Sequence, residues 1–328
     1  MQNQISELVA AILASKKESG GVSHIVWIGA GGSNGGNYAA QYFMEHEATE
    51  LVSYSYTSNE FVHAIPKFVG PKTVVVAVSM RGTAETIEAA RVARACGATT
   101  VAIYVDESAL TDVCEYQIPY QSLAVDQTNQ SRSNAAITLR LAIEFVQQTE
   151  GYKYYQDACA GFELVDPIYK KAFAYCQPLA QKWAQENVHR PTVNILANGP
   201  LMGAAYVFAI CNVQEMLQMD AVTTNNCDFF HGPFEVVDKT SSIFLLMSSG
   251  RNRANDERAL RFLNRFAGEN TYVLDAKELG IYDIKDSVNE YFNHLIFSPI
   301  LNNVYMRALS QTTNKDYTTR RYMWKEQY

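Results

Sequence analysis

The strongest constraint on the fold is a series of short, uninterrupted apolar runs, each followed by a turn rich in glycine or hydroxyl residues. In the first half of the chain these runs are residues 24–29, 73–79 and 99–106, and longer stretches with helical spacing separate them. Strands that are apolar along their whole length are typical of a parallel sheet covered by helices on both faces. We therefore expect a doubly wound α/β domain.

The same plan recurs in the second half. Residues 194–206 repeat the first turn at a constant spacing, which pairs Gly31 with Gly199, and apolar runs at 242–250 and 272–275 repeat the later strands. Agreement across three elements indicates an internal duplication. We predict two tandem doubly wound parallel-sheet domains.

Composition agrees with two soluble globular domains, since the 328 residues are 48% hydrophobic and 19% charged. Residues 148–155 have the character of a helix end and a connector, so we place the domains at 1–155 and 156–328. The net charge of −7 comes without basic runs, which argues against a nucleic-acid partner. The N-terminal residues lack a signal peptide and no apolar run is long enough to span a membrane. We expect a cytoplasmic protein with no membrane partner.

The sequence gives little support for a metal or a nucleotide cofactor. The six cysteines and six histidines show no spacing typical of a metal site, and we predict free thiols and no metal. The dinucleotide fingerprint G-x-G-x-x-G is broken by Asn34 at its third glycine, and residues 52–56 lack the acidic residue expected after the second strand. We predict no cofactor.

Two turns in the first half are suited to an anion such as phosphate. The turn 29–36 offers backbone N–H groups at a helix start together with the Ser33 hydroxyl, and the turn 79–86 adds further hydroxyls and a guanidinium. Ordinary Ser/Thr helix caps are the alternative interpretation. The corresponding turn 198–201 has no hydroxyl and contains a proline, so only the first half is expected to bind phosphate.

A glutamate and a histidine in the second half form a candidate acid/base pair. His231 lies at a Gly-Pro bend fenced by three phenylalanines, in the segment 228–235, and Glu215 lies sixteen residues earlier within the strongly apolar helical run 204–217. A core histidine bonded to backbone and a glutamate in a structural ion pair are the alternatives. Together the two side chains could move a proton next to a carbonyl.

These features resemble the sugar isomerase (SIS) family, and within it the double-domain group that includes the isomerase domain of glucosamine-6-phosphate synthase and the fructosamine 6-phosphate deglycases. The resemblance rests on the Gly-Gly-Ser turn, the Ser-x-x-Gly turn, the Glu215 and His231 pair, and the tail 316–325. The segment Phe-Phe-His-Gly-Pro-Phe-Glu and the tail look like the deglycase branch in particular. The resemblance implies two flavodoxin-like domains and a C-terminal tail that closes the site.

The family holds a sugar 6-phosphate on the two turns. Carried over to this sequence, the phosphate-binding residues are Gly32, Ser33, Ser79, Arg81, Thr83 and Thr86. The chain is about one residue shorter than its relatives between Gly82 and Thr86, which leaves open which threonine contacts the phosphate. The stretch 127–134 also departs from the family pattern, so sugar contacts from that loop are not carried over.

The resemblance implies a deglycase that splits a 6-phosphorylated Amadori compound into glucose 6-phosphate and an amine, often an amino acid, through an enaminol. Glu215 is then the base at C1 and His231 the acid. Lys325 is a third candidate, because the synthase places a lysine nine residues after an aspartate, although a solvated tail lysine is the simpler interpretation.

Two other functions stay open. An aldose–ketose or aminotransferring isomerase would use the same acid/base pair, and a sugar-phosphate sensor would bind without turnover. The synthase itself requires a glutaminase domain, and we expect none here, since the sequence starts at the first sugar domain. Family sites often take the histidine from a neighbouring subunit, so we expect a homodimer with a shared active site. The amine carried by the substrate cannot be read from the sequence.

Overall fold

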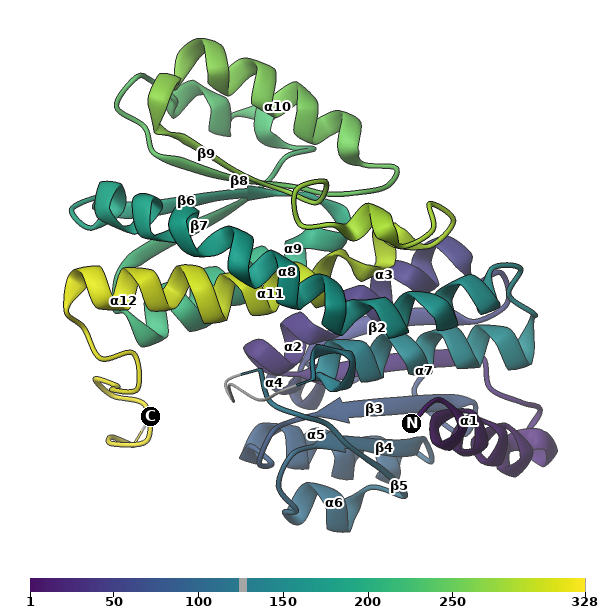
Figure 1. Ribbon diagram of the computed structural model, residues 1–328. Coiled ribbons are helices and arrows are strands. Elements are labelled where there is room, and N and C mark those ends of the chain that lie inside the picture. The colour runs from purple at the N-terminus through teal and green to yellow at the C-terminus, as the bar shows by residue number, and fades with distance from the viewer. Residues whose placement is uncertain (124–128, 328) are drawn as a thin grey trace. The chain divides into compact units, whose positions relative to one another are not determined.

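The chain forms two compact units in a computed structural model that describes residues 1–123 and 129–327. Unit 1 is Met1–Glu163 and unit 2 is Leu164–Tyr328. The division falls inside the long helix α8 (Tyr155–Asn187), whereas the sequence predicted a boundary near residue 155, where this helix begins (Figure 1). Gln127 and Thr128, in the loop that departs from the family pattern, lie outside the described residues.

Unit 1 contains a five-stranded parallel sheet with the strand order β2-β1-β3-β4-β5. The strands are β1 (His24–Gly29), β2 (Val52–Thr57), β3 (Thr73–Val78), β4 (Thr99–Tyr104) and β5 (Tyr116–Pro119). Every residue of the central strand β3 is buried, as its unbroken apolar sequence predicts. The order reverses direction at β1 and β3, which places the carboxyl ends of these two strands side by side.

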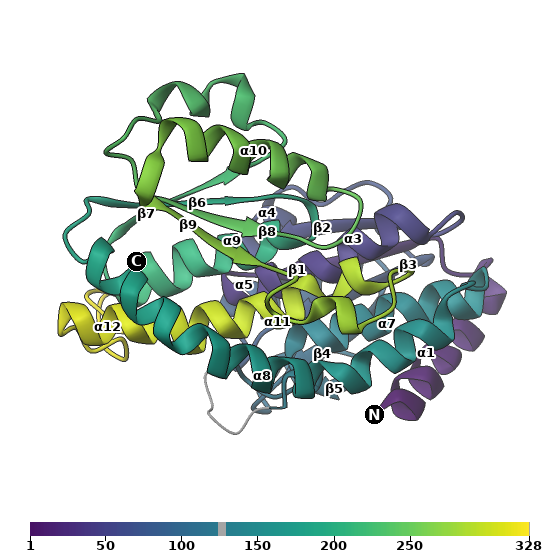
Figure 2. The same ribbon diagram turned by 45° about the horizontal axis from the view of Figure 1, so that its top comes forward.

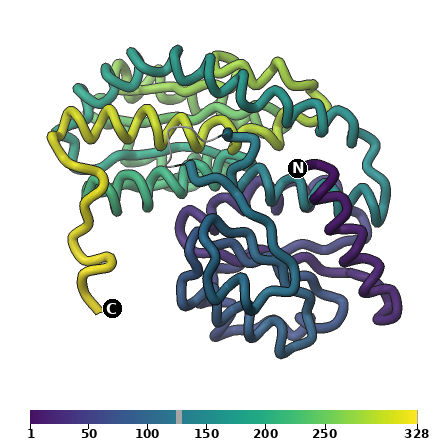
Figure 3. The backbone as a smooth tube through the Cα atoms, turned by 60° about the horizontal axis from the view of Figure 1, so that its bottom comes forward, coloured from purple at the N-terminus to yellow at the C-terminus, as the bar shows by residue number. Residues whose placement is uncertain are grey.

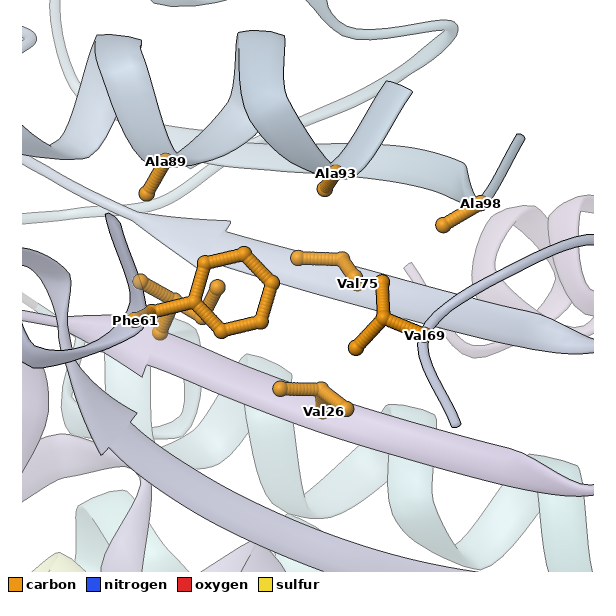
Figure 4. Close-up of a cluster of buried hydrophobic side chains, with 8 residues drawn as sticks. Val26, Phe61, Val69, Val75, Ala89, Ala93 and Ala98 are labelled. Carbon is orange, nitrogen blue, oxygen red and sulfur yellow. The ribbon is translucent and has the colours of Figure 1, made fainter. Parts of the chain in front are cut away.

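Helices cover both faces of this sheet. α3 (Tyr38–Glu47) and α7 (Asn134–Thr149) lie on one face, and α1 (Gln2–Lys16) packs on α7. α4 (Ser58–His63) and α5 (Ala84–Ala95) lie on the other face, and α6 (Ala109–Val113) packs on α5. Figure 4 shows that second face, where Phe61 of α4 and the alanines of α5 meet Val26 and Val75 of the sheet. Small alanines allow the helix to approach the strands closely.

A buried carboxylate fastens the first helix to unit 1. Glu144 of α7 is 1% exposed and accepts hydrogen bonds from Gln2 Nε2 at 2.5 Å, from the Tyr155 hydroxyl at 2.5 Å and from Gln148 Nε2 at 3.0 Å. A buried carboxylate requires such donors, because leaving one unpaired costs several kcal/mol. The cluster therefore ties the start of α1 and the start of α8 to α7.

Unit 2 repeats the plan with a four-stranded parallel sheet in the order β7-β6-β8-β9. Its strands are β6 (Thr192–Ala197), β7 (Asp220–Asn225), β8 (Ile243–Met247) and β9 (Thr271–Asp275). The order matches β2-β1-β3-β4 of unit 1, as an internal duplication requires. α10 (Arg253–Phe266) covers one face, while α9 (Met202–Val207) and α11 (Asn293–Ile300) cover the other (Figure 2). The prediction of two tandem doubly wound domains is confirmed.

Two π-helical segments interrupt the helices of unit 2. The run 204–217, expected to be one apolar helix, continues from α9 into the π-helix η4 (Phe208–Met216), and a second π-helix, η10 (Leu301–Met306), joins α11 to α12 (Arg307–Thr313). The side chains of Asn212 and Asn302 join the two segments by a buried hydrogen bond of 2.7 Å. π-Helical turns are rare and occur frequently at functional sites.

The C-terminal tail follows α12 without regular structure (Figure 3). Asn314 ends the helix in the left-handed conformation with φ 51°, and Lys315 Nζ then donates to Gln218 Oε1 at 2.8 Å. The tail is thereby fastened to the end of η4. Among the helices that the structure describes, none is both long enough and apolar enough to cross a membrane.

Candidate active site

The two turns of unit 1 that the sequence predicts to bind phosphate begin helices at the carboxyl ends of β1 and β3. α2 (Gly32–Gly36) starts directly after β1, and α5 starts after Thr83. The first turn is tight enough to require glycine at position 29, where a Cβ atom would lie 2.8 Å from the backbone nitrogen of Asn34. The predicted residues Gly32, Ser33, Ser79 and Thr83 thus belong to neighbouring strand ends.

The Ser33 side chain has a neighbour that the sequence did not indicate. It lies near the phenol of Tyr120, which follows β5; burial raises the pKa of Tyr120 above its usual value, and the nearby Ser33 hydroxyl acts to lower it. A neutral phenol can both donate and accept. Tyr120 is therefore a partly buried polar neighbour of the Ser33 hydroxyl.

The three hydroxyl groups of the second turn, those of Ser79, Thr83 and Thr86, differ in burial and in hydrogen-bond partners. Ser79 is 3% exposed and its hydroxyl oxygen accepts a hydrogen bond from the Thr83 N–H at 3.0 Å. Thr86 is fully buried, and its hydroxyl contacts those of Ser58 at 2.7 Å and Thr83 at 2.8 Å. Thr83 is exposed, so it can contact a ligand, whereas Thr86 and Ser58 can only orient it. The turn is not an ordinary helix cap, because the N-cap residue of α5 is Thr83 and its side chain makes no capping hydrogen bond.

Arg81 points away from the buried hydroxyls. Its side chain is largely exposed, and its Nε lies 2.9 Å from Oδ2 of Asp106 in an exposed ion pair. An anion on the turn would have to draw this guanidinium from Asp106. Such exposed pairs contribute little stability, so the exchange costs little.

The corresponding strand ends of unit 2 surround a carboxylate of the protein itself. Asp256, in the first turn of α10, is fully buried; Oδ1 accepts from Asn198 Nδ2 at 2.5 Å and Asn226 Nδ2 at 2.7 Å. Oδ2 accepts from the Ser248 N–H and hydroxyl, both at 2.8 Å. Burial raises the pKa of Asp256 to about 6, against the lowering effect of these hydrogen bonds. An internal anion thus occupies the place that corresponds to the phosphate turns of unit 1.

Glu215 lies near the end of the π-helix η4 and is paired with the C-terminal tail. Its side chain is 22% exposed, and both Nε and Nη2 of Arg320 lie 2.7 Å from its Oε1. Lys325 Nζ donates to the carbonyl oxygen of Arg320 at 2.5 Å. Glu215 and Lys325, both predicted site residues, each contact Arg320, the one at its guanidinium and the other at its backbone carbonyl. The sequence had left open whether this glutamate has a structural partner, and it has one.

His231 departs from the expected environment. The three phenylalanines of its segment pack against Phe262 of α10 as part of the core of unit 2, and the imidazole is exposed. The apolar fence around His231 was a wrong interpretation, because the rings turn inward beneath α10. The short helix η5 (Phe229–His231) brings His231 to the surface after the end of β7.

Glu215 and His231 lie at opposite ends of β7. Glu215 precedes this six-residue strand and His231 follows it. A strand of that length spans about 20 Å. One chain therefore does not bring the predicted acid and base together. Within residues 1–123 and 129–327, no group of three or more His, Cys, Asp or Glu side chains could hold a metal ion.

Known proteins resemble this chain along its whole length. The SIS domain model matches residues 21–123. A crystal structure of a protein named as a phosphosugar isomerase, from Salmonella typhimurium LT2, is 36% identical, with 99% of each chain covered and a TM-score of 0.93. The chain belongs to the SIS family.

Two curated relatives of this SIS protein are deglycases. Fructosamine deglycase FrlB of Bacillus subtilis (strain 168) is 29% identical over 313 residues, 94% of this chain and 93% of the relative. Fructoselysine 6-phosphate deglycase of Escherichia coli (strain K12) is 26% identical over 237 residues, 70% of this chain and 67% of the relative. These relatives confirm the family and the deglycase branch recognised in the sequence, together with the prediction of an enzyme.

Proposed function

We propose that this SIS protein is a fructosamine 6-phosphate deglycase, which releases glucose 6-phosphate and a free amine from a 6-phosphorylated Amadori compound. The observation that carries the proposal is the position of Glu215, a partly exposed carboxylate on a π-helix beneath the tail that bears Lys325. The similarity to named deglycases over most of the chain supports the same reaction.

The reaction needs a base and an acid. The substrate carries the amine on C1 and a ketone at C2. Glu215 takes a proton from C1 to give an enaminol, and protonation at C2 moves the double bond to C1=N. Water adds to this imine at C1, and the C–N bond breaks to give the aldehyde of glucose 6-phosphate and the amine. Lys325, a cation beside Arg320, is suited to the negative charge that develops on the C2 oxygen.

The phosphate binds in unit 1. Thr83 presents its hydroxyl at the start of α5, and Ser33 lies at the start of α2, near Tyr120. Backbone N–H groups at helix starts favour an anion. Asp256 holds the equivalent place in unit 2, which gives a physical reason for one phosphate per chain.

Replacing Thr83 by valine is expected to raise KM for the phosphorylated substrate about 10- to 100-fold, the effect of one lost hydrogen bond to a charged group, with little change in kcat. Thr240→Val, in an exposed turn of unit 2, is the matched control. Initial rates over a range of substrate concentrations measure both constants. An unchanged KM for Thr83→Val would exclude Thr83 from the phosphate site.

The acid comes from a second copy of the chain. Because Glu215 and His231 lie at opposite ends of β7, a site that uses both residues requires His231 of one chain to serve Glu215 of another. A two-fold dimer supplies two such sites by symmetry. We therefore propose a homodimer with shared sites.

Mixing inactive Glu215→Ala and His231→Ala chains under conditions of subunit exchange is expected to restore about a quarter of the wild-type activity. Half of the dimers are then mixed, and each has one intact site of two. A mixture of Glu215→Ala with the double variant Glu215→Ala/His231→Ala has no intact site and is the control. Absence of recovery, with exchange verified by differently tagged chains, contradicts the shared site.

A panel of 6-phosphorylated Amadori compounds tests the function directly. Glucose 6-phosphate is followed with a coupled dehydrogenase, and the released amine is quantified in parallel. Equal amounts of both products establish a deglycase. A sugar-phosphate isomerase is the second candidate, favoured by the name of the 36% identical relative; it converts fructose 6-phosphate without amine release. Binding of the panel without any turnover indicates a sensor.

A further inference from the structure

We propose that Arg320 is a positioning residue for the catalytic base: it holds one oxygen of Glu215 and leaves the other directed to the substrate. The inference rests on the proposed function, since it assumes that Glu215 removes the C1 proton. It assigns a specific task to a residue of the tail that was not among the predicted site residues.

The contact between the two side chains is asymmetric. An arginine that binds a carboxylate in the usual fork places one N–H group on each oxygen. Here Nε and Nη2 both contact Oε1 at 2.7 Å, and Oε2 accepts no hydrogen bond from any residue in the described part of the chain. Oε2 is not one of the buried polar atoms that lack a hydrogen-bond partner, so it is open to solvent. A base needs one such unoccupied oxygen.

Arg320 is itself held rigidly. Its side chain is only 9% exposed, and Nη1 donates to the carbonyl oxygens of Tyr317 at 2.8 Å and Thr319 at 2.9 Å. The Trp324 ring lies 5.4 Å from the guanidinium, within the range of a cation–π contact. The planar guanidinium makes all four hydrogen-bonding contacts at once, which an ammonium group on a flexible stem cannot reproduce.

The same residue couples the base to the tail. Lys325 donates to the Arg320 carbonyl, and Lys315 fastens the start of the tail to Gln218, three residues after Glu215. Docking of the tail therefore aligns the Glu215 carboxylate and fixes Lys325 on the backbone of the same arginine. Such alignment acts on kcat more than on binding of the phosphate, which is anchored in unit 1.

Steady-state kinetics of Arg320→Gln, Arg320→Lys and Arg320→Ala test the inference, with Arg321→Gln as the matched control. Arg321 is exposed; it makes a 3.4 Å contact to Gln218, and its guanidinium lies 5.9 Å from the Tyr322 ring, but within the described residues it forms no hydrogen bond or ion pair with Glu215. We expect Arg320→Gln to lower kcat about 10- to 100-fold, the effect of lost hydrogen bonds to a charged group, while KM changes less than about threefold. Arg320→Lys should be intermediate, and millimolar guanidinium should restore part of the kcat of Arg320→Ala.

The outcomes separate this inference from the proposed function. Wild-type kcat in Arg320→Gln, with Glu215→Gln inactive, overturns the positioning role alone. Full turnover in Glu215→Gln overturns the proposed function. If Arg320→Gln loses folded structure by circular dichroism, the folded Arg320→Lys variant decides: a loss confined to KM contradicts positioning, and a loss in kcat supports it.

Discussion

Replacing Glu215 by glutamine is expected to lower kcat for glucose 6-phosphate release at least about 100-fold, the usual loss when a general base is removed. Glutamine keeps the size of the side chain, and its amide oxygen can still accept the hydrogen bonds of Arg320 at the position of Oε1. The change therefore removes the basic oxygen while it preserves the packing of η4. Binding of the phosphate in unit 1 should be unaffected.

The matched control is Glu269→Gln, which changes an exposed glutamate of unit 2 outside the predicted site. It should retain wild-type kcat and KM. Single-turnover kinetics with a C1-deuterated substrate add a second test, because slow proton removal in the variant should increase the isotope effect. A Glu215→Gln variant with near-normal turnover and an unchanged isotope effect would assign the base to another residue.

The sequence predicted the sheets well because strand formation follows a local pattern. Apolar runs such as 73–78 became fully buried central strands, and the turn at Gly29 required glycine where the strand meets the next helix. The choice between Thr83 and Thr86 concerned a local stretch, but the burial of Thr86 depends on a residue outside it, Ser58, whose hydroxyl contacts that of Thr86. A single sequence contains no sign of that contact.

The environment of His231 was mispredicted because aromatic residues adjacent in sequence need not surround their neighbour. Phe229, Phe230 and Phe234 were interpreted as a fence, yet they turn toward Phe262, 28 to 33 positions further along the chain, and leave the imidazole at the surface. The direction of a side chain in an irregular segment depends on which element covers it. That element, α10, is distant in sequence.

The partner of Glu215 illustrates the same limit. Burying a carboxylate without a hydrogen-bond donor is costly, so a glutamate in an apolar run predicts that some donor lies close to it. The donor is Arg320, separated from it by 105 positions. Several arginines and lysines of the tail satisfy that requirement equally well from sequence alone, and only the path of the tail after Asn314 selects one of them.

Replacing Asp256 by alanine is expected to lower the free energy of unfolding of unit 2 by about 3 kcal/mol, because it leaves buried donors without an acceptor. The carboxylate accepts four hydrogen bonds, and its donors Asn198, Asn226 and Ser248 stand at the carboxyl ends of three different strands. Its loss disconnects these strand ends from the first turn of α10. Urea titration followed by circular dichroism measures the change.

Two further variants distinguish the loss of the acceptor from the loss of a buried charge. Asp256→Asn keeps the volume but replaces one acceptor oxygen by an NH2 group that faces two donors, so it should destabilise unit 2 nearly as much as alanine does. Glu257→Gln, the next residue of α10, breaks only the partly exposed ion pair with Arg253 and should change the free energy by less than about 1 kcal/mol. If Asp256→Asn were as stable as the wild-type protein, the hydrogen bonds that the carboxylate accepts would not be what holds the three strand ends together. If it is as unstable as alanine, the carboxylate is needed for both of its oxygens, and unit 2 carries an anion of its own at the strand ends that correspond to the proposed phosphate site of unit 1.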